Sequence, residues 1–94
     1  MNNTISLEKY GPIISSEEKG KEIYSKIKEI LSKETEVIID FKNVASMATF
    51  CAKQIFGQLY IDLGSEEFYS RVKICNANND IKIIIRMGIV SAIS

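Results

Sequence analysis

The hydrophobic and polar positions near the N-terminus repeat with a period of two residues. Between residues 5 and 8, hydrophobic side chains alternate with polar ones, which predicts a short strand with one buried face. The dipeptide Gly11-Pro12 is typical of a turn and ends this strand. The pair Ile13-Ile14 then predicts a second short extended piece that leads into a helix.

Two longer segments have the period of an α-helix. Ser15 followed by Glu18 is a capping-box pattern, which predicts the start of the first helix. Gly20 is expected to let this helix approach a sheet closely. The hydrophobic residues at helical spacing in the first helix are Ile23, Tyr24, Ile27, Ile30 and Leu31. The second helix is predicted over residues 49–63, with Gly64 as its end. Its hydrophobic face consists of Ala52, Ile55, Phe56, Leu59 and Leu63.

The remaining segments predict further strands and one ambiguous element. Residues 36–41 are a nearly continuous β-branched run, which is typical of a central parallel strand covered on both faces. Residues 65–68 predict a short capped turn of helix, and residues 72–75 predict another strand. From Asn79, a candidate cap, the isoleucine-rich run fits both a strand and a helix, because periodicity alone does not separate them. The alternation of strands and helices predicts a layered α/β domain.

Length and charge narrow the classes of function. The chain has 94 residues, so we expect residues 1–94 to form a single domain. Lys+Arg and Asp+Glu both total 12, and this balance argues against nucleic-acid binding, which usually relies on a basic excess. Near neutrality also suits self-association. The N-terminus does not resemble a signal peptide and no apolar run reaches membrane-spanning length, so we expect a cytoplasmic protein without a membrane partner.

The sequence lacks the usual catalytic and cofactor-binding patterns. It contains no histidine, which excludes Ser-His-Asp and Cys-His arrangements. Cys51 and Cys75 do not have metal-ligand spacing, and we expect two reduced thiols packed as small apolar groups and no metal site. None of the five glycines belongs to a phosphate-binding loop motif. We therefore expect no cofactor and no enzymatic activity.

Asp40 is the carboxylate best placed for a function. It ends the predicted central strand, where α/β proteins often put functional groups. No second carboxylate or base stands near it in sequence. We therefore favour a structural role, in which Asp40 hydrogen-bonds the loop that follows.

Residues 39–47 have the sequence Ile-Asp-Phe-Lys-Asn-Val-Ala-Ser-Met, and a helix follows that runs through Phe56-Gly57. This segment, from residue 39 to residue 57, resembles the core of STAS domains. STAS domains are the anti-sigma factor antagonist modules that also occur at the ends of sulfate transporters. The chain is similar in particular to a bacterial family of small, uncharacterised STAS-like proteins. Further matching stretches are Tyr10-Gly11-Pro12, residues 16–20, Glu67-Phe68 and Ile74-Cys75-Asn76.

This resemblance implies a fold and a closing helix. It implies a STAS-like layered domain, in which helices pack mainly on one face of a small mixed sheet. It also implies that Asp80 onward is a helix, because STAS domains close with a helix against the sheet. Hydrophobic residues would then remain on the surface beyond what one sheet face hides. These residues are Met87, Ile89, Val90 and Ile93.

The resemblance also implies a regulatory site at the start of the second helix. In STAS antagonists a partner kinase, which is also the anti-sigma factor, phosphorylates a serine there and so disrupts the complex. The position of that serine falls on Phe50, so a direct copy of the serine switch is not expected. Thr49 and Ser46 are the candidate phosphorylation sites, with Thr49 favoured as a simple helix N-cap. Phe50 is a candidate interface anchor or a core residue. The candidate partner-binding residues are Ser46, Ala48, Thr49, Phe50 and Lys53.

Three hypotheses follow for the function. The first is a regulatory module that binds a protein partner, by resemblance an anti-sigma-type ATPase or kinase, through the segment from Ser46 to Lys53. The second is a domain that binds a small ligand or a nucleotide at Asp40, Asn43 and Thr49. The third is a self-associating structural unit that forms homo-oligomers.

Overall fold

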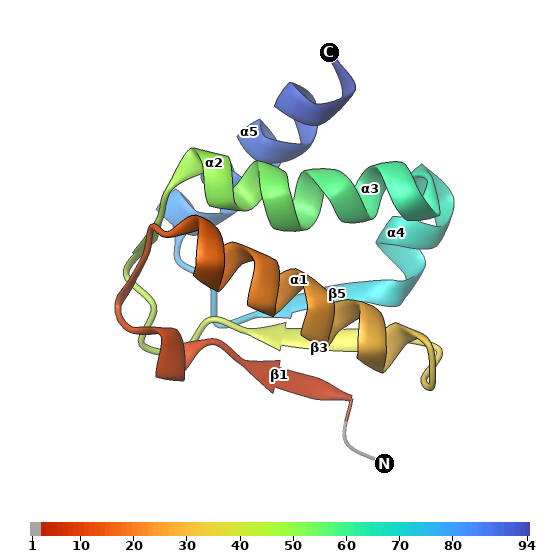
Figure 1. Ribbon diagram of the computed structural model, residues 1–94, viewed down its shortest axis with the longest axis horizontal. Coiled ribbons are helices and arrows are strands. Elements are labelled where there is room, and N and C mark those ends of the chain that lie inside the picture. The colour runs from red at the N-terminus through yellow and green to blue at the C-terminus, as the bar shows by residue number, and fades with distance from the viewer. Residues whose placement is uncertain (1–2) are drawn as a thin grey trace.

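A parallel sheet forms the base of the molecule. The computed structural model describes residues 3–94, and its sheet has the order β1-β3-β5, formed by β1 (Thr4–Ser6), β3 (Val37–Asp40) and β5 (Val72–Cys75) (Figure 1). A separate two-stranded ladder joins β2 (Ile13–Ile14) to β4 (Ser46–Met47). The strand pairs within residues 3–94 are all parallel, which corrects the expected mixed sheet. Successive strands of the sheet are linked by helical crossovers, and such crossovers keep neighbouring strands parallel.

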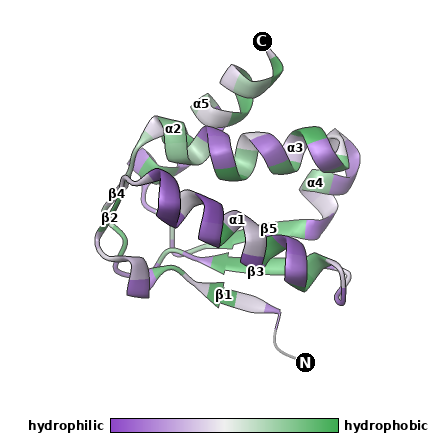
Figure 2. Cartoon of the chain, in the orientation of Figure 1, coloured by the Kyte–Doolittle hydropathy of each residue, from purple (hydrophilic) through white to green (hydrophobic). Residues whose placement is uncertain are grey.

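The helices cover one face of this sheet. Along β3, Val37 and Ile39 are fully buried, whereas Ile38 is only half-buried. Figure 1 shows α1, α2 and α3 on the same side of the sheet, and Figure 2 shows hydrophobic residues along β3. The expectation of helices mainly on one face is confirmed, and the expectation that β3 is covered on both faces is wrong. A β-branched run in this protein reflects strand propensity as well as burial.

The predicted helices are present, and the second contains a local irregularity. The helical elements are η1 (Glu8–Tyr10), α1 (Glu17–Leu31), α2 (Thr49–Ala52), η2 (Lys53–Gly57), α3 (Gln58–Leu63), α4 (Ser65–Arg71) and α5 (Asn79–Ile93). Elements α2, η2 and α3 follow one another without a break, so the helix predicted over 49–63 is confirmed, with a π-helical turn at η2. Gly64 ends it at φ 82°, a backbone conformation that glycine adopts without strain.

Two helices begin one residue away from the predicted caps. The N-cap of α1 is Ser16, whose hydroxyl oxygen accepts a hydrogen bond from the Lys19 amide at 3.1 Å, and not Ser15. The N-cap of α5 is Asn78, whose side-chain oxygen accepts from the Ile81 amide at 2.8 Å. In both cases an identical residue stands next to the predicted one, and the backbone conformation decides which of the two is the cap.

Helix α5 confirms the helical interpretation of the C-terminal segment. Ile81, Ile85 and Ile89 face the core, and Met87 and Val90 are each more than half exposed. The expectation of leftover apolar surface is thus correct for Met87, Val90 and Ile93, and it is wrong for Ile89. A helix that is apolar on both its inner and its outer side fits the period of a helix and also that of a strand, which explains why the sequence pattern is ambiguous.

Helix α5 crosses η2 at very close range. A Cβ atom on Gly88 would lie 2.6 Å from the carbonyl carbon of Ala52 and 2.7 Å from the amide nitrogen of Lys53. A Cβ atom on Gly57 would lie 2.7 Å from the Ala92 Cβ. These distances are shorter than any unstrained contact between non-bonded heavy atoms, so the two helices can approach this closely only because both positions lack side chains.

Gly20 also marks a close approach, but to a helix. A Cβ atom on Gly20 would collide with the side-chain amide of Gln54, which belongs to η2. The predicted approach to a sheet is therefore wrong. A glycine on the face of a helix indicates that another segment approaches the backbone closely, and only the tertiary structure shows which segment it is.

A tyrosine–carboxylate contact joins α1 to α3, and it allows a pH test. The Tyr24 hydroxyl donates to Asp62 Oδ2, and Lys28 and Gln58 also bind the Asp62 carboxylate. The Tyr24 hydrogen bond is the largest cause that lowers the pKa of Asp62, and burial together with Asp62 raises the pKa of Tyr24 to about 12. The Asp62 contribution to stability is therefore present above its ordinary pKa and is lost as the pH falls through the lowered value.

We predict that Tyr24→Phe raises the pKa of Asp62 towards its ordinary value, because the hydroxyl donor is removed. A carboxyl-carbon NMR titration measures this pKa directly. Tyr69→Phe alters a tyrosine on α4 and leaves the Asp62 pKa unchanged. An Asp62 pKa that is the same in Tyr24→Phe and in the wild type contradicts the assignment.

Candidate functional site

The segment from Ser46 to Lys53 is held in place by the N-terminal part of the chain. The backbone amides of Ala45 and Ser46 donate to the Pro12 carbonyl oxygen at 2.7 Å and 3.1 Å. The Ala48 amide donates to the Ile14 carbonyl oxygen at 2.8 Å. The segment between β3 and α2 therefore contains the short strand β4, which fixes the direction in which α2 begins.

The side chains of this segment differ in exposure. Thr49 and Lys53 are exposed, and the Phe50 side chain is 53 % exposed, whereas Ser46 and Ala48 are half-buried. The interpretation of Phe50 as a core residue is wrong. Thr49 is the first residue of α2, and the N-cap is Ala48, so the interpretation of Thr49 as the cap is also wrong. Phe50 leaves a large aromatic surface in water at the start of this helix.

A shallow hollow lies beside Phe50. Its volume is about 240 Å³, and its lining residues are Phe50, Lys53, Gln54, Gln58, Ile61 and Ala92. Ile61 is 53 % exposed, so two large apolar side chains flank the hollow. Gln54 Oε1 is buried and accepts no hydrogen bond within residues 3–94. We call this surface, consisting of Thr49, Phe50, Lys53 and Ile61, the Phe50 patch.

Asp40 and Asn43 lie at the carboxyl end of the sheet and bind other parts of the chain. Asp40 Oδ1 accepts from the Lys42 amide at 2.9 Å and from Asn76 Nδ2 at 2.8 Å. The Asn76 side chain, followed by the Lys42 amide, holds the pKa of Asp40 below its ordinary value. Asn43, at φ 64°, donates to Glu8 Oε1 at 2.6 Å. These contacts fit the favoured structural role of Asp40.

The proposed ligand set is only partly assembled by the fold. Asp40 ends β3 and Asn43 follows three residues later, but Thr49 lies beyond β4, and no side-chain hydrogen bond within residues 3–94 joins it to either of them. Asn76 and Glu8 take the places next to Asp40 and Asn43 instead. The structure therefore brings together a different group of polar side chains from the one that the sequence indicates.

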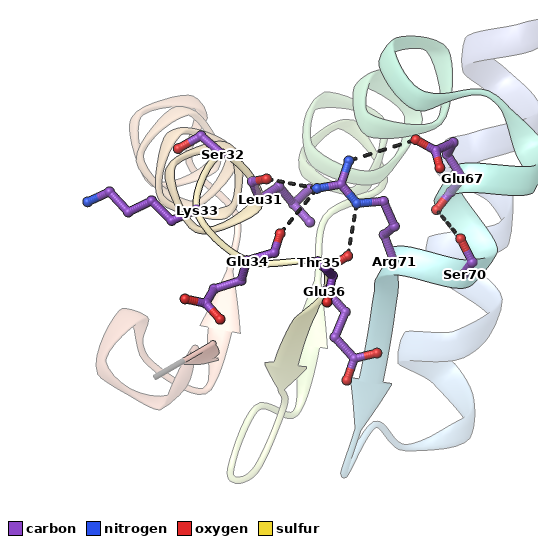
Figure 3. A pocket seen from close by; sticks show the side chains of 9 residues that line it. All are labelled: Leu31, Ser32, Lys33, Glu34, Thr35, Glu36, Glu67, Ser70 and Arg71. Carbon is purple, nitrogen blue, oxygen red and sulfur yellow. Dashed lines mark hydrogen bonds and ion pairs between the residues drawn. The ribbon is translucent and has the colours of Figure 1, made fainter. Parts of the chain in front are cut away.

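A larger hollow lies at the opposite end of the sheet. It measures about 600 Å³ and lies between the loop after α1 and the end of α4 (Figure 3). The Arg71 side chain forms part of its wall. The guanidinium group donates to the carbonyl oxygens of Leu31, Glu34 and Thr35 at 2.8, 3.2 and 2.9 Å. Because the guanidinium already satisfies these carbonyls, we interpret this region as a structural clamp.

Neither cysteine forms a disulfide, as the sequence predicts. Cys51 is buried and its thiol lies 3.4 Å from the Ser16 carbonyl oxygen, while Cys75 is half-buried. Burial raises the pKa of both thiols. In the described part of the chain, no group of three or more His, Cys, Asp or Glu side chains is arranged to hold a metal ion. Within residues 3–94, none of the helices has both the length and the apolar character needed to cross a membrane.

Layer arrangement and sheet order define a small α/β domain in which helices cover one face of a parallel sheet. A comparison with protein families matches residues 19–82 to a STAS-like domain of unknown function (DUF4325), and the chain therefore belongs to this family. The comparison with curated proteins and the comparison with solved structures each gave no match.

Sequence reasoning missed Arg71 and Asn76. Arg71 contacts backbone carbonyls 36 to 40 residues earlier, and no local pattern indicates such contacts. Asn76 directly follows β5 and has a φ of 58°. An asparagine immediately after a predicted parallel strand was the available signal, because this residue tolerates the left-handed conformation and places its amide at the edge where Asp40 also lies.

Proposed function

We propose that this domain is a regulatory module that binds a protein partner through the Phe50 patch. The observation that supports this proposal best is the 53 % exposure of Phe50 at the start of a helix whose backbone is fixed by β2 and β4. Exposed aromatic side chains on a rigid backbone are typical interface anchors, because they bury much area at little cost in conformational entropy.

The patch has the features of a small hot spot. Phe50 and Ile61 provide apolar area on both sides of the 240 Å³ hollow, and Lys53 provides a cation at its border. An apolar partner side chain entering this hollow would displace water from both residues.

The kind of partner is proposed from the resemblance to STAS antagonists. By similarity to anti-sigma factor antagonists, we propose an ATPase or kinase of the anti-sigma type in a bacterial cytoplasm. In this proposal the domain acts by binding and does not catalyse a reaction.

Thr49 is the better of the two candidate phosphorylation sites. Its side chain is exposed at the first turn of α2, whereas Ser46 is half-buried in β4. The first turn of α2 contains no acidic residue, so a phosphate there would not meet a like charge on that turn. A phosphate on Thr49 would add negative charge beside Phe50 and would weaken a complex formed through the Phe50 patch.

We predict that Phe50→Ala lowers the affinity for the partner at least tenfold, and that Lys53→Glu has a similar effect. The partner is first identified by capture from bacterial lysate and mass spectrometry, which also reports modification of Thr49 or Ser46. Its affinity is then measured by calorimetry with the wild type and both variants. Ile83→Ala is the matched control, because Ile83 is also 53 % exposed but lies on α5. If both patch variants bind as the wild type does, or if no specific protein is captured, the proposal is wrong.

The two alternative functions have less support. A ligand at Asp40, Asn43 and Thr49 would have to replace hydrogen bonds that Asp40 and Asn43 already make. Thermal-shift measurements with millimolar nucleotide test this alternative, since a ligand of the folded state raises the melting temperature. Self-association through the exposed Met87, Val90 and Ile93 would appear as concentration-dependent light scattering.

A further inference from the structure

A second, mostly apolar groove lies beside β5, separate from the Phe50 patch. It measures about 370 Å³ and runs between α3, α4 and β5 on one side and α5 on the other. We call it the β5–α5 groove. Its lining residues are Tyr60, Phe68, Tyr69, Val72, Ile74, Lys82, Ile85, Arg86, Ile89, Val90 and Ile93.

The floor of the groove lies on the face of the sheet that the helices cover. Ile5, Ile39 and Ile74 form one row across the three strands, because Ile5 pairs with Ile39 and Ile39 pairs with Ile74. Ile5 is 7 % exposed and Ile39 is fully buried, but Ile74 is 37 % exposed. A residue on the inner face of the sheet is therefore in contact with water, because no segment within residues 3–94 covers the groove above it.

The outer edge of β5 is also open. Within residues 3–94 the sheet has the order β1-β3-β5, so β5 has a strand on one side only. An edge strand presents a row of backbone N–H and C=O groups that can pair with an added strand. Helices α4 and α5 provide the walls of the groove beside this edge, where Tyr69, Val90 and Ile93 are each more than half exposed.

The charged side chains that line the groove have one sign. The charged side chains that line it are Lys82 and Arg86, and no acidic residue in the described part of the chain lines it. Lys73 is exposed on β5 between Val72 and Ile74, so it leaves the strand on the opposite face of the sheet from these two residues, and its ammonium group donates to the Tyr69 carbonyl oxygen at 3.3 Å. An occupant that runs along β5 therefore meets apolar residues on one side and cations at the border and on the other side.

We propose that the β5–α5 groove binds an extended peptide segment of a partner protein that adds a strand to the edge of β5. The segment alternates apolar and acidic residues. Its apolar side chains enter the groove over Val72 and Ile74, and its acidic side chains lie beside Lys73 on the outer face. Strand addition of this kind obtains affinity from backbone hydrogen bonds and specificity from the pockets that receive alternate side chains.

The experiment selects binders and then maps where they bind. Random eight-residue peptides displayed on phage are selected against the wild-type protein, and the most enriched one is synthesised. The expected peptide alternates apolar and acidic residues and shifts the amide NMR signals of β5 and α5. Lys73→Glu is expected to weaken its binding at least tenfold, and Tyr69→Ala is expected to weaken it by removing part of the wall.

Changes in the peptide test the same proposal without altering the fold. N-methylation of the alternate amides that would pair with β5 is expected to abolish binding, and replacement of the acidic residues by lysine is expected to weaken it at least tenfold. Laurate tests whether an anionic amphiphile is the real occupant. The proposal is overturned if N-methylation has no effect, if selected peptides shift other surfaces or lack acidic residues, or if laurate binds and no peptide does. Phe50→Ala is expected to leave peptide binding unchanged, which separates this proposal from the one for the Phe50 patch.

Discussion

Gly88→Val is expected to lower the free energy of unfolding by about 2–3 kcal/mol. A Cβ atom at this position would lie 2.6 Å from the carbonyl carbon of Ala52 and 2.7 Å from the amide nitrogen of Lys53. Both atoms belong to the backbone of the neighbouring helix, so they cannot move aside as the end of a flexible side chain can. Helix α5 would have to move away from η2 and would lose contacts along the whole crossing.

Urea unfolding followed by circular dichroism measures this loss. Met87→Val is the matched control, since it introduces the same side chain one residue earlier in α5, where Met87 is 51 % exposed. Met87→Val also introduces the lower helix propensity of valine, but it leaves the close crossing of α5 and η2 unchanged. A Gly88→Val protein that is as stable as Met87→Val would show that the close crossing is not required.

Arg71→Ala is expected to lower the free energy of unfolding by about 2 kcal/mol, because hydrogen bonds from a charged donor contribute more than neutral ones. The Arg71 guanidinium donates to three backbone carbonyl oxygens at the end of α1 and in the loop before β3 (Figure 3). Removing it leaves these carbonyls without their donor and frees the loop. For a domain of this size, the melting temperature is expected to fall by roughly 10 °C.

Glu67→Gln separates the stability that comes from the Arg71–carbonyl hydrogen bonds from the stability that comes from the Arg71–Glu67 ion pair. Glu67 Oε1 lies 3.9 Å from Arg71 Nη1, and its side chain is 60 % exposed, so the pair is expected to contribute less than about 0.5 kcal/mol. Differential scanning calorimetry of the two variants compares the two contributions. Equal losses of melting temperature in Arg71→Ala and Glu67→Gln would contradict the assignment of the clamp to the carbonyl contacts.

Most elements of the fold could be predicted because they depend on local pattern. The helix over 49–63 has a continuous apolar face, and Gly64 ends it, so both its type and its end follow from neighbouring residues. The caps at Ser16 and Asn78 each stand next to an identical residue, and composition cannot decide between two such neighbours. The direction of the strands also could not be derived from periodicity, because parallel and antiparallel strands share the same period.

The exposure of Phe50 had a signal in the sequence. Successive residues of a helix are about 100° apart, so Phe50 lies nearly opposite Ala52, which belongs to the predicted buried face. The β5–α5 groove had no such signal. It depends on how α3, α4 and α5 are placed around β5, and that arrangement results from the packing of segments that are distant in sequence.

The parallel sheet has a consequence for the time course of folding. Thr4 pairs with Ile38, Ile13 with Ser46, and Val37 with Val72, so each of these strand pairs joins residues more than thirty positions apart. No hairpin is available to start the sheet within residues 3–94, and each pair closes a large loop before it gains its first hydrogen bond. The rate-limiting barrier to folding should therefore depend on the formation of α1, which shortens the distance between β1 and β3, so helix-stabilising substitutions on the exposed side of α1 should accelerate folding.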